Sequence, residues 1–379
     1  FGKGIRMSIN LSSPDINQSD IDAVVAVLKT PTLSLGPKLT EFEQAMARYV
    51  GVKHAVAVNS GTSALDCALR GHGIAAGDEV ITTPFSFIAS SNCILFQGAR
   101  PVFVDIDPAT YNIDVSKIEA AITPRTKALL PVDVFGSVAD MDAVNDIARR
   151  HHLFVVEDSC EALGSTYKGR PAGSLGHCGA FAFYPNKQMT TGEGGMLVTN
   201  DDHLAAMARS LRNQGRGEGS AWLAHERLGY NYRLPDILCA LGISQLARLD
   251  QFVALREAVA ARYNALLADV PDVMVPPPNP FGRMSWFVYV IRLADRFSRE
   301  DRDAVMQGLR QRGIGCNNYF SPIHLQPFYQ QGLGTRRGDF PVTERIADRT
   351  IALPFHNHLP ESDQRTVVNA LKELLAARR

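Results

Sequence analysis

Lys187 is the residue of this sequence best suited to covalent chemistry. It lies in the stretch 179–195, between an apolar run at 180–183 and a turn rich in threonine and glycine, and a second apolar run follows at 196–198. A lysine is ordinarily a solvated surface charge. A lysine held among apolar neighbours can instead serve as an amine nucleophile that forms Schiff bases. Lys187 is therefore a candidate nucleophile if partner groups lie nearby.

A turn of small residues after the apolar run 54–58 offers a place for an anion. Gly61, Thr62 and Ser63 begin a helical segment there. Their backbone N–H groups and hydroxyls would gather at the positive end of the helix, where phosphates bind. The same residue types also serve as plain N-caps, so the turn alone leaves both interpretations open.

An aromatic residue and an acid follow two further apolar runs. Phe87 comes after the run 79–83, where core packing and stacking on a flat heteroaromatic ligand are both open. Asp158 follows the run 153–156. A buried carboxylate at that position requires a partner, which can be an arginine, a metal ion or a cationic ring nitrogen.

The elements that must position these groups form an α/β pattern. Apolar runs rich in Val, Ile and Phe alternate for the most part with helical segments, which predicts a largely parallel sheet of seven strands flanked by helices. Ligands of such sheets bind beyond the C-terminal ends of the strands, where these groups lie. The expected strands are 54–58, 79–83, 101–105, 128–132, 153–156, 180–183 and 196–198.

The second part of the chain predicts a smaller domain. Residues 235–269 keep a helical period without an interrupting Pro, so we expect one long helix there. The proline-rich segment 276–280 follows as a joint, and a strand, a helix capped at Ser298 and a last helix after Pro360 complete an α+β unit. We therefore expect a large α/β domain with an N-terminal helical arm over 7–250 and a small C-terminal α+β domain over 251–379.

Composition narrows the class of partner. The 379 residues include 39 basic and 39 acidic side chains, so no net charge favours nucleic acid or a membrane surface. The six cysteines show no paired spacing, which favours reduced thiols in a cytoplasmic protein and no metal site. No apolar run reaches the roughly 18 residues of a membrane span. We expect residues 1–6, before Met7, to lie outside the native fold.

The four chemical groups together match pyridoxal phosphate (PLP). That cofactor needs an anchored phosphate, a stacked ring, a carboxylate on its pyridinium nitrogen and a lysine bound to its aldehyde. Each signal is modest by itself, and the combination is specific.

The sequence resembles the DegT-type sugar aminotransferases, a family of fold type I PLP enzymes in the aspartate aminotransferase superfamily. The resemblance covers nearly the whole chain from about Ile9. It implies the fold type I architecture, with its mostly parallel seven-stranded sheet and smaller C-terminal α+β domain. The matching segments are 33–37, 57–65, 77–84, 101–107, 156–158, 179–195, 229–233 and 322–324.

The resemblance assigns roles around the cofactor. Lys187 would be the catalytic residue, bound to PLP as a Schiff base and then moving a proton. Asp158 would pair with the pyridinium nitrogen, and Glu161 would lie near the phenolic oxygen. Phe87 would stack on the ring. The phosphate would be held by Gly61, Thr62 and Ser63.

Further roles lie outside this cluster. Asn231 and Arg233 match a segment that reaches into the partner's site in the family, Asn231 toward the cofactor and Arg233 toward the substrate, which implies a homodimer with shared active sites. Tyr319 and His324 match a loop near the sugar nucleotide. One position departs from the pattern: many members have a phosphate-binding serine where this chain has Ala182.

The reaction implied is transamination. Related sugar 3-dehydratases carry histidine at the position of Lys187, and a lysine favours an aminotransferase. The expected substrate is a nucleotide-linked 4-keto-6-deoxy sugar, with L-glutamate as amino donor. Amination at C3, a non-sugar ketone as acceptor, and a non-catalytic PLP-binding regulatory protein remain alternatives.

Overall fold

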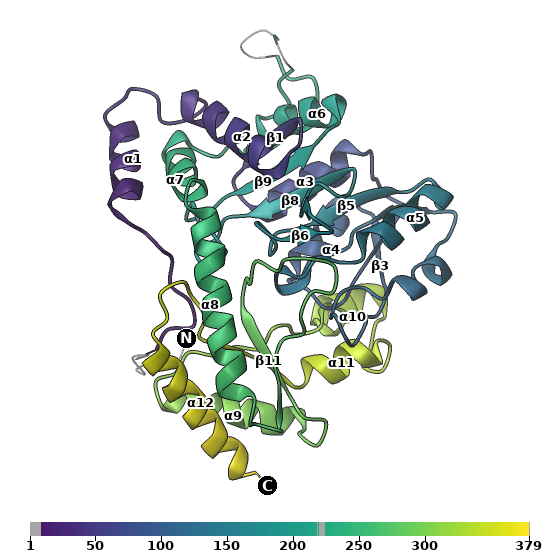
Figure 1. Cartoon of the computed structure of the whole chain (residues 1–379). Helices are drawn as coiled ribbons and strands as arrows, with labels where there is room; N and C mark the ends of the chain where they lie inside the picture. The colour runs from purple at the N-terminus through teal and green to yellow at the C-terminus, as the bar shows by residue number, and fades with distance from the viewer. Residues whose placement is uncertain (1–8, 218, 220–223, 379) are drawn as a thin grey trace.

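The computed structural model describes residues 9–217, 219 and 224–378. Its centre is a seven-stranded sheet, which lies among the helices in Figure 1. The strand order is β1-β9-β8-β5-β4-β2-β3, and β9 runs antiparallel to both of its neighbours while the other neighbours are parallel. This confirms the predicted α/β class. The strands are β1 His54–Val58, β2 Glu79–Thr82, β3 Arg100–Phe103, β4 Thr126–Leu129, β5 Phe154–Asp158, β8 Cys178–Ala182 and β9 Gly195–Thr199. The expectation for residues 1–6 lies outside the described residues.

The antiparallel direction of β9 follows from the connection that precedes it. Parallel neighbours need a crossover of a dozen or more residues, usually a helix. Residues 183–194 form no helix and return directly from the end of β8 to the start of β9. The loop that carries Lys187 therefore lies at the same edge of the sheet as the C-terminal ends of the parallel strands.

Helices cover both faces of this sheet because each strand alternates its buried side chains. Val56 and Val58 pack with α3 Gly61–Gly71, α4 Ala89–Phe96 and α6 Asp202–Arg212. Ala55 and Ala57 face the opposite way and pack with α2 Pro37–Val50 and α7 Asp236–Leu246. Farther along that second face, α5 Met141–His151 covers β4 and β5. A short hairpin of β6 Thr166–Tyr167 and β7 Arg170–Pro171 lies beside them.

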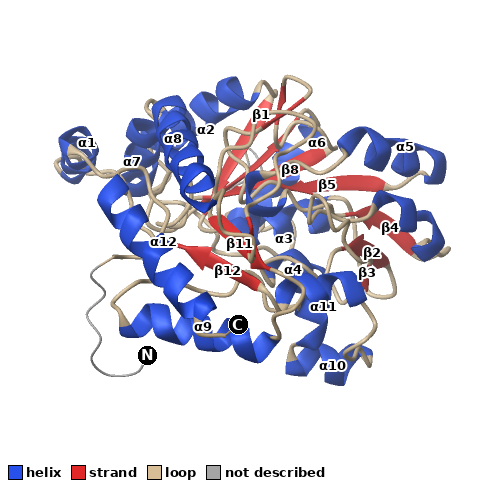
Figure 2. Cartoon of the chain, turned by 60° about the horizontal axis from the view of Figure 1, so that its bottom comes forward, coloured by secondary structure: helices blue, strands red, loops and turns tan. Residues whose placement is uncertain are grey.

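A second, antiparallel sheet belongs to the C-terminal part of the chain. It has the order β10-β11-β12, and its core is shared with α8, α9 and α12 (Figure 2). Ser298 caps α9 through a capping box with Asp301, as predicted. The domain boundary at residue 250 stays a prediction. The elements are α8 Leu249–Leu267, β10 Val273–Met274, β11 Tyr289–Leu293, α9 Arg299–Gln311, α10 Pro327–Leu333, α11 Pro341–Ala347, β12 Thr350–Leu353 and α12 Glu361–Ala376.

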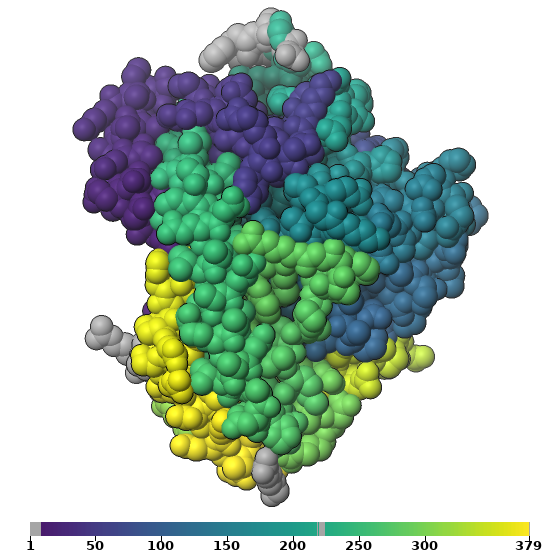
Figure 3. All heavy atoms as spheres, in the orientation of Figure 1, coloured from purple at the N-terminus to yellow at the C-terminus, as the bar shows by residue number. Residues whose placement is uncertain are grey.

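The predicted single helix over 235–269 is wrong. The chain forms α7 and α8, which meet at 61°. Arg248 at the bend pairs with Asp20 of α1 Gln18–Leu28 at 2.5 Å and with Asp15 at 3.2 Å. The bend lets α7 pack on α1, beside which it lies in Figure 3, while α8 continues to the second sheet. No single described helix is long and apolar enough to cross a membrane, and α7 with α8 passes that test only as a bent pair.

Candidate active site

A cavity of about 490 Å³ opens at the C-terminal edge of the large sheet. It brings together seven of the residues singled out from the sequence. They come from the start of α3, the segment before α4, the end of β5 and the loop after it, the loop after β8 and a loop before α10. Lys187 is the one basic side chain among the described residues that line it. The seven residues are Gly61, Thr62, Phe87, Asp158, Glu161, Lys187 and Tyr319.

The Lys187 amine is held between a carboxylate and an aromatic ring. Its Nζ lies 3.6 Å from Glu161 Oε1 and 3.8 Å from the centroid of the Phe287 ring. The side chain is 12% exposed, so the amine reaches the cavity but little bulk solvent. The Lys187 N–H donates to the Tyr184 carbonyl at 2.9 Å, which fixes the turn that carries it.

Asp158 ends β5 as a buried carboxylate with neutral donors. Ser90 Oγ donates to Oδ2 at 2.6 Å, and the Cys160 N–H donates to Oδ1 at 3.2 Å. Ser86 Oγ lies 2.7 Å from Ser90 Oγ, so Ser86, Ser90 and Asp158 form a chain of hydrogen bonds that ends at the carboxylate. Among the described residues Asp158 has no ion-pair partner, which leaves a buried acid ready for a cationic ligand.

Glu161 faces Lys187 from a buried position. Its Oε2 accepts the Phe135 N–H at 2.9 Å, and desolvation by burial raises the pKa of its carboxyl, against the opposing effect of the Lys187 charge. Burial, with the charge of Glu161, also raises the pKa of Tyr319 to about 12. A carboxyl with a raised pKa can donate a hydrogen bond as well as accept one.

The N-terminus of α3 forms the wall beside Ala182. A Cβ on Gly61 would lie 2.7 Å from Ala182 Cβ and 2.8 Å from Cys160 Sγ, so glycine is required at this close approach. Gly61 and Thr62 line the cavity, whereas Ser63 does not. The Ser63 hydroxyl donates to Asn59 Oδ1 at 2.7 Å and serves the turn itself.

Three predicted residues lie away from this cavity. Asn231 forms an isolated bridge with Asn213, and Arg233 Nη1 donates to Asn213 Oδ1 at 3.0 Å. His324 is buried, and its Nε2 lies 2.9 Å from Glu344 Oε1. Within one chain none of the three lines the cavity, so their roles stay predictions.

Sequence reasoning missed several residues that line the cavity. Tyr184, Asn186 and Glu193 flank Lys187 along the chain, and their closeness to it was an available signal. Ser90 is in the first turn of α4 and Ser86 lies in the segment before that helix, and their hydroxyls meet at 2.7 Å. Phe287 comes from a segment 100 residues after Lys187 along the chain and carried no local signal.

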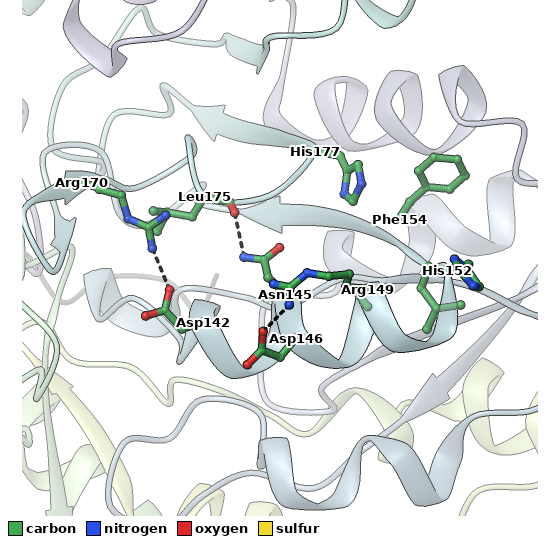
Figure 4. A pocket seen from close by; sticks show the side chains of 11 residues that line it. Asp142, Asn145, Asp146, Arg149, His152, Phe154, Arg170, Leu175 and His177 are labelled. Atoms are coloured by element: carbon green, nitrogen blue, oxygen red, sulfur yellow. Dashed lines mark hydrogen bonds and ion pairs between the residues drawn. The ribbon is translucent and has the colours of Figure 1, made fainter.

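A second, larger hollow lies away from this site. It is a groove of about 860 Å³ beside α5 (Figure 4). Its charges are paired internally, Arg170 with Asp142 at 2.8 Å and Arg149 with Asp146 at 2.9 Å. The smaller cavity holds the acids and the lysine, so it is the candidate active site.

The fold and the cavity together define an α/β enzyme with a lysine in its active site. Comparison of the sequence with known proteins identifies the family to which it belongs. The profile of the DegT/DnrJ/EryC1/StrS aminotransferase family matches residues 14–372. GDP-perosamine synthase of Caulobacter vibrioides is 42% identical over 369 residues, which cover 97% of this chain and 98% of that protein.

Solved structures of aminotransferases have the same fold as this chain. PseC of Helicobacter pylori, an aminotransferase involved in the biosynthesis of pseudoaminic acid, has a TM-score of 0.92 at 31% identity and covers 97% of this chain and 99% of its own. The PLP form of the putative sugar aminotransferase Spr1654 of Streptococcus pneumoniae has a TM-score of 0.92 at 29% identity. The match covers 97% of this chain and 99% of the Spr1654 chain. The chain belongs to the DegT/DnrJ/EryC1/StrS aminotransferase family and is a sugar aminotransferase.

Proposed function

We propose that this chain uses PLP to transfer the amino group of L-glutamate to the keto carbon of a nucleotide-linked 4-keto-6-deoxy sugar. The observation that carries the proposal is the position of Lys187 Nζ, 3.6 Å from Glu161 in a cavity that Asp158 and the start of α3 also line. PLP chemistry requires an amine, a buried acid for the ring nitrogen and a helix N-terminus for the phosphate, and the residues around this single cavity include all three.

The residues that line the cavity fit PLP. Gly61 and Thr62, at the N-terminus of α3, would hold the phosphate, helped by Ser63 through the turn. Asp158 would pair with the ring nitrogen, which suits a buried carboxylate whose present donors are Ser90 and the Cys160 N–H. Phe87 would stack on the ring, since its side chain is 61% exposed beside the cavity.

The chain's own groups then perform the transfer. When bound, PLP supplies an electron sink that stabilises negative charge on the carbon bearing the amino group. Lys187 Nζ holds and moves the proton at that carbon, and Glu161 lies beside it to hydrogen-bond the phenolic oxygen. The partly enclosed cavity limits the access of water to that proton.

The substrate class is supported by relatives. One relative is a GDP-perosamine synthase, and PseC is an aminotransferase involved in the biosynthesis of pseudoaminic acid. Tyr319 lines the cavity and would contact the sugar. The run 190–195 resembles members that aminate C4, and this favours C4 over C3.

We further propose that the enzyme is a cytoplasmic homodimer with shared active sites. Asn231, Arg233 and His324 do not line the cavity of their own chain, and the resemblance assigns the first two to the partner's site. Apolar side chains remain exposed on α1 and in the segments just before and after it, which suits an interface. All six cysteines are free, as in a reducing compartment. The exposed apolar residues are Ile16, Ile21, Val25, Leu28, Leu33 and Leu35.

One experiment tests the activity. The purified protein is loaded with PLP and incubated with L-glutamate and a panel of keto sugar nucleotides, and NMR of the product locates the new amine. We expect amination at C4 and loss of both the visible absorbance band and the activity in Lys187→Ala. Amination at C3 or of a non-sugar ketone would correct the substrate, and a protein that binds no PLP would refute the proposal.

A further inference from the structure

We propose that Arg256 is a positioning residue for Lys187, because its guanidinium fastens the Lys187 backbone to the segment that carries Phe287. This inference rests on the proposed function of Lys187. Arg256 lies on α8, outside the residues that line the cavity, and acts through the backbone of Lys187 and Phe287.

The guanidinium binds three carbonyl groups from two segments. Its Nη2 donates to the Lys187 carbonyl at 3.0 Å. Its Nη1 donates to the carbonyls of Trp286 at 3.1 Å and Phe287 at 3.2 Å. Lys187 and Phe287 are far apart in the sequence, so this fork holds their backbones at a fixed separation.

The buried charge of Arg256 is stabilised by backbone carbonyl groups and not by a carboxylate, unlike the other buried arginines that the structure describes. Among the arginines that the structure describes, three are almost fully buried: Arg212 is 6% exposed, Arg256 is 3% exposed and Arg302 is 2% exposed. Arg212 pairs with Glu43, and Arg302 pairs with Asp303 at 2.7 Å. Arg256 forms no salt bridge among the described residues, and its Nε has no hydrogen-bond partner.

Such a charge is costly to bury, and the cost points to a positional role. Burial lowers the pKa of Arg256 to about 10, so the guanidinium remains charged at neutral pH. An apolar side chain of similar length would fill the same space without that cost. What it would not supply is a rigid planar fork that reaches both backbones at once.

The position of the Lys187 amine depends on the two segments that Arg256 joins. The Phe287 ring contacts Lys187 Nζ from one side, at 3.8 Å from its centroid. Gln188 provides a second tie, with its Nε2 donating to the Glu161 carbonyl and to Ser285 Oγ at 2.7 Å. Only the Arg256 hydrogen bond, of these two interactions, is made to the backbone of Lys187 itself.

Mutation of Arg256 to Met and to Lys tests the inference. Met removes the fork, and Lys keeps the charge with one nitrogen that cannot serve both segments. Arg302→Met is the matched control, since Arg302 is buried and donates to the Ala347 carbonyl at 2.9 Å in the C-terminal part. The full-length proteins are compared by thermal unfolding first.

Two readouts follow, one of them independent of turnover. In the PLP-loaded protein, the single-turnover rate with L-glutamate should fall on the order of 10²-fold in Arg256→Met, because a misplacement of about 1 Å costs that much. In the cofactor-free protein, the rate at which trinitrobenzenesulfonate labels Lys187, followed by peptide mass spectrometry, should change in both Arg256 variants. Arg302→Met should lower stability and alter neither readout.

A double-mutant cycle separates positioning from general destabilisation. Arg256→Met and Phe287→Leu both act on the same amine, so the fold-loss in single-turnover rate of the double mutant should be smaller than the product of the two single losses. For Arg302→Met with Phe287→Leu, the loss in the double mutant should equal that product within about twofold. Folded Arg256 variants with wild-type turnover and labelling would overturn the inference, as would an additive cycle. If Arg256→Met does not fold, Arg256→Lys decides by the same readouts. A wild-type protein that fails with glutamate while the Arg256 variants change Lys187 labelling would refute the proposed reaction with glutamate, and the structural part of the inference, that Arg256 positions the Lys187 amine, would stand.

Discussion

Ala182 occupies a position at which the family resemblance implies a phosphate-binding serine in many members. Its Cβ lies 2.7 Å from where a Cβ on Gly61 would be, so a hydroxyl at position 182 would stand beside the N-terminus of α3. We expect Ala182→Ser to tighten PLP binding about tenfold or more, since a hydrogen bond to a charged group contributes about 1.5–3 kcal/mol. A fluorescence titration of the cofactor-free protein measures this. Ala182→Gly, which adds no hydroxyl, should not tighten binding.

Ser90 is a residue whose effect should be confined to Asp158. Ser90→Ala removes the donor to Asp158 Oδ2 and leaves a buried acceptor unsatisfied, which costs about 1–3 kcal/mol. We expect PLP affinity and the rate of the glutamate half-reaction to fall roughly tenfold. Ser91→Ala is the neighbouring control, because Ser91 Oγ instead bonds Tyr329 OH at 2.6 Å. Equal losses in both variants would show that the effect is structural.

At the scale of elements, the contact between β9 and the start of α3 positions Gly61 and Thr62, the residues proposed to hold the phosphate. A Cβ on Gly195 would lie 2.3 Å from the carbonyl carbon and oxygen of Ser60 and 2.6 Å from the Gly61 nitrogen. Backbone atoms cannot give way as a flexible side chain can, so Gly195→Ala should displace the N-terminus of α3. We expect a loss of stability of about 1–3 kcal/mol and weaker PLP binding.

Gly332 gives the control for that substitution. It lies in α10, and a Cβ there would meet no heavy atom within 4 Å. Gly332→Ala should be neutral or stabilising by up to about 1 kcal/mol, because alanine has the higher helix propensity. Urea unfolding of both variants measures the difference. A Gly195→Ala protein with wild-type stability and PLP affinity would show that α3 can shift without consequence.

Elements that depend on local pattern were predictable, and elements that depend on distant contacts were not. The strands of the large sheet and the Ser298 cap follow from runs of apolar residues and from a capping box. The bend between α7 and α8 has no Gly or Pro, and the C-cap Ala247 keeps helical dihedral angles. Its visible cause is the pairing of Arg248 with Asp20, more than 200 residues away, and no periodicity encodes that contact.

The same division applies to the site. Lys187, Asp158 and the Gly61 turn could be predicted because each follows an apolar run at a known edge of the sheet. Phe287 and Arg256 could not, because their contacts with Lys187 arise only when the second part of the chain folds against the first.

At the scale of the whole molecule, histidines whose pKa is lowered in the folded protein contribute to the response of stability to acid. Desolvation lowers the pKa of His72 to about 4, and it also lowers the pKa of His177, His324 and His356. The unfolded chain binds these protons near the ordinary histidine pKa of about 6.5. The neutral forms therefore stabilise the fold above that pH, and their contribution is lost as the pH falls toward the folded-state pKa values.

Buried acids act in the opposite sense. Burial raises the pKa of Asp133, Glu157 and Glu161, so these groups favour the fold when protonated, and that contribution is lost as the pH rises. The response of the wild-type protein is thus a sum of two opposed effects. A single-histidine variant is required to isolate one of them.

His72→Phe isolates the clearest case. His72 stacks on Phe154 with ring centroids 4.3 Å apart, a contact that phenylalanine retains without the titrating group. Between pH 7 and pH 5 the wild-type protein should lose up to about 2 kcal/mol more unfolding free energy than the variant, because a pKa of about 4 makes the folded state resist protonation across most of that range. Urea unfolding at the two pH values measures the difference, and His203→Gln, at an exposed position of α6, should follow the wild-type response. Parallel behaviour of wild type and His72→Phe would mean that water reaches His72 in the folded protein, and that the wild-type response to acid arises elsewhere.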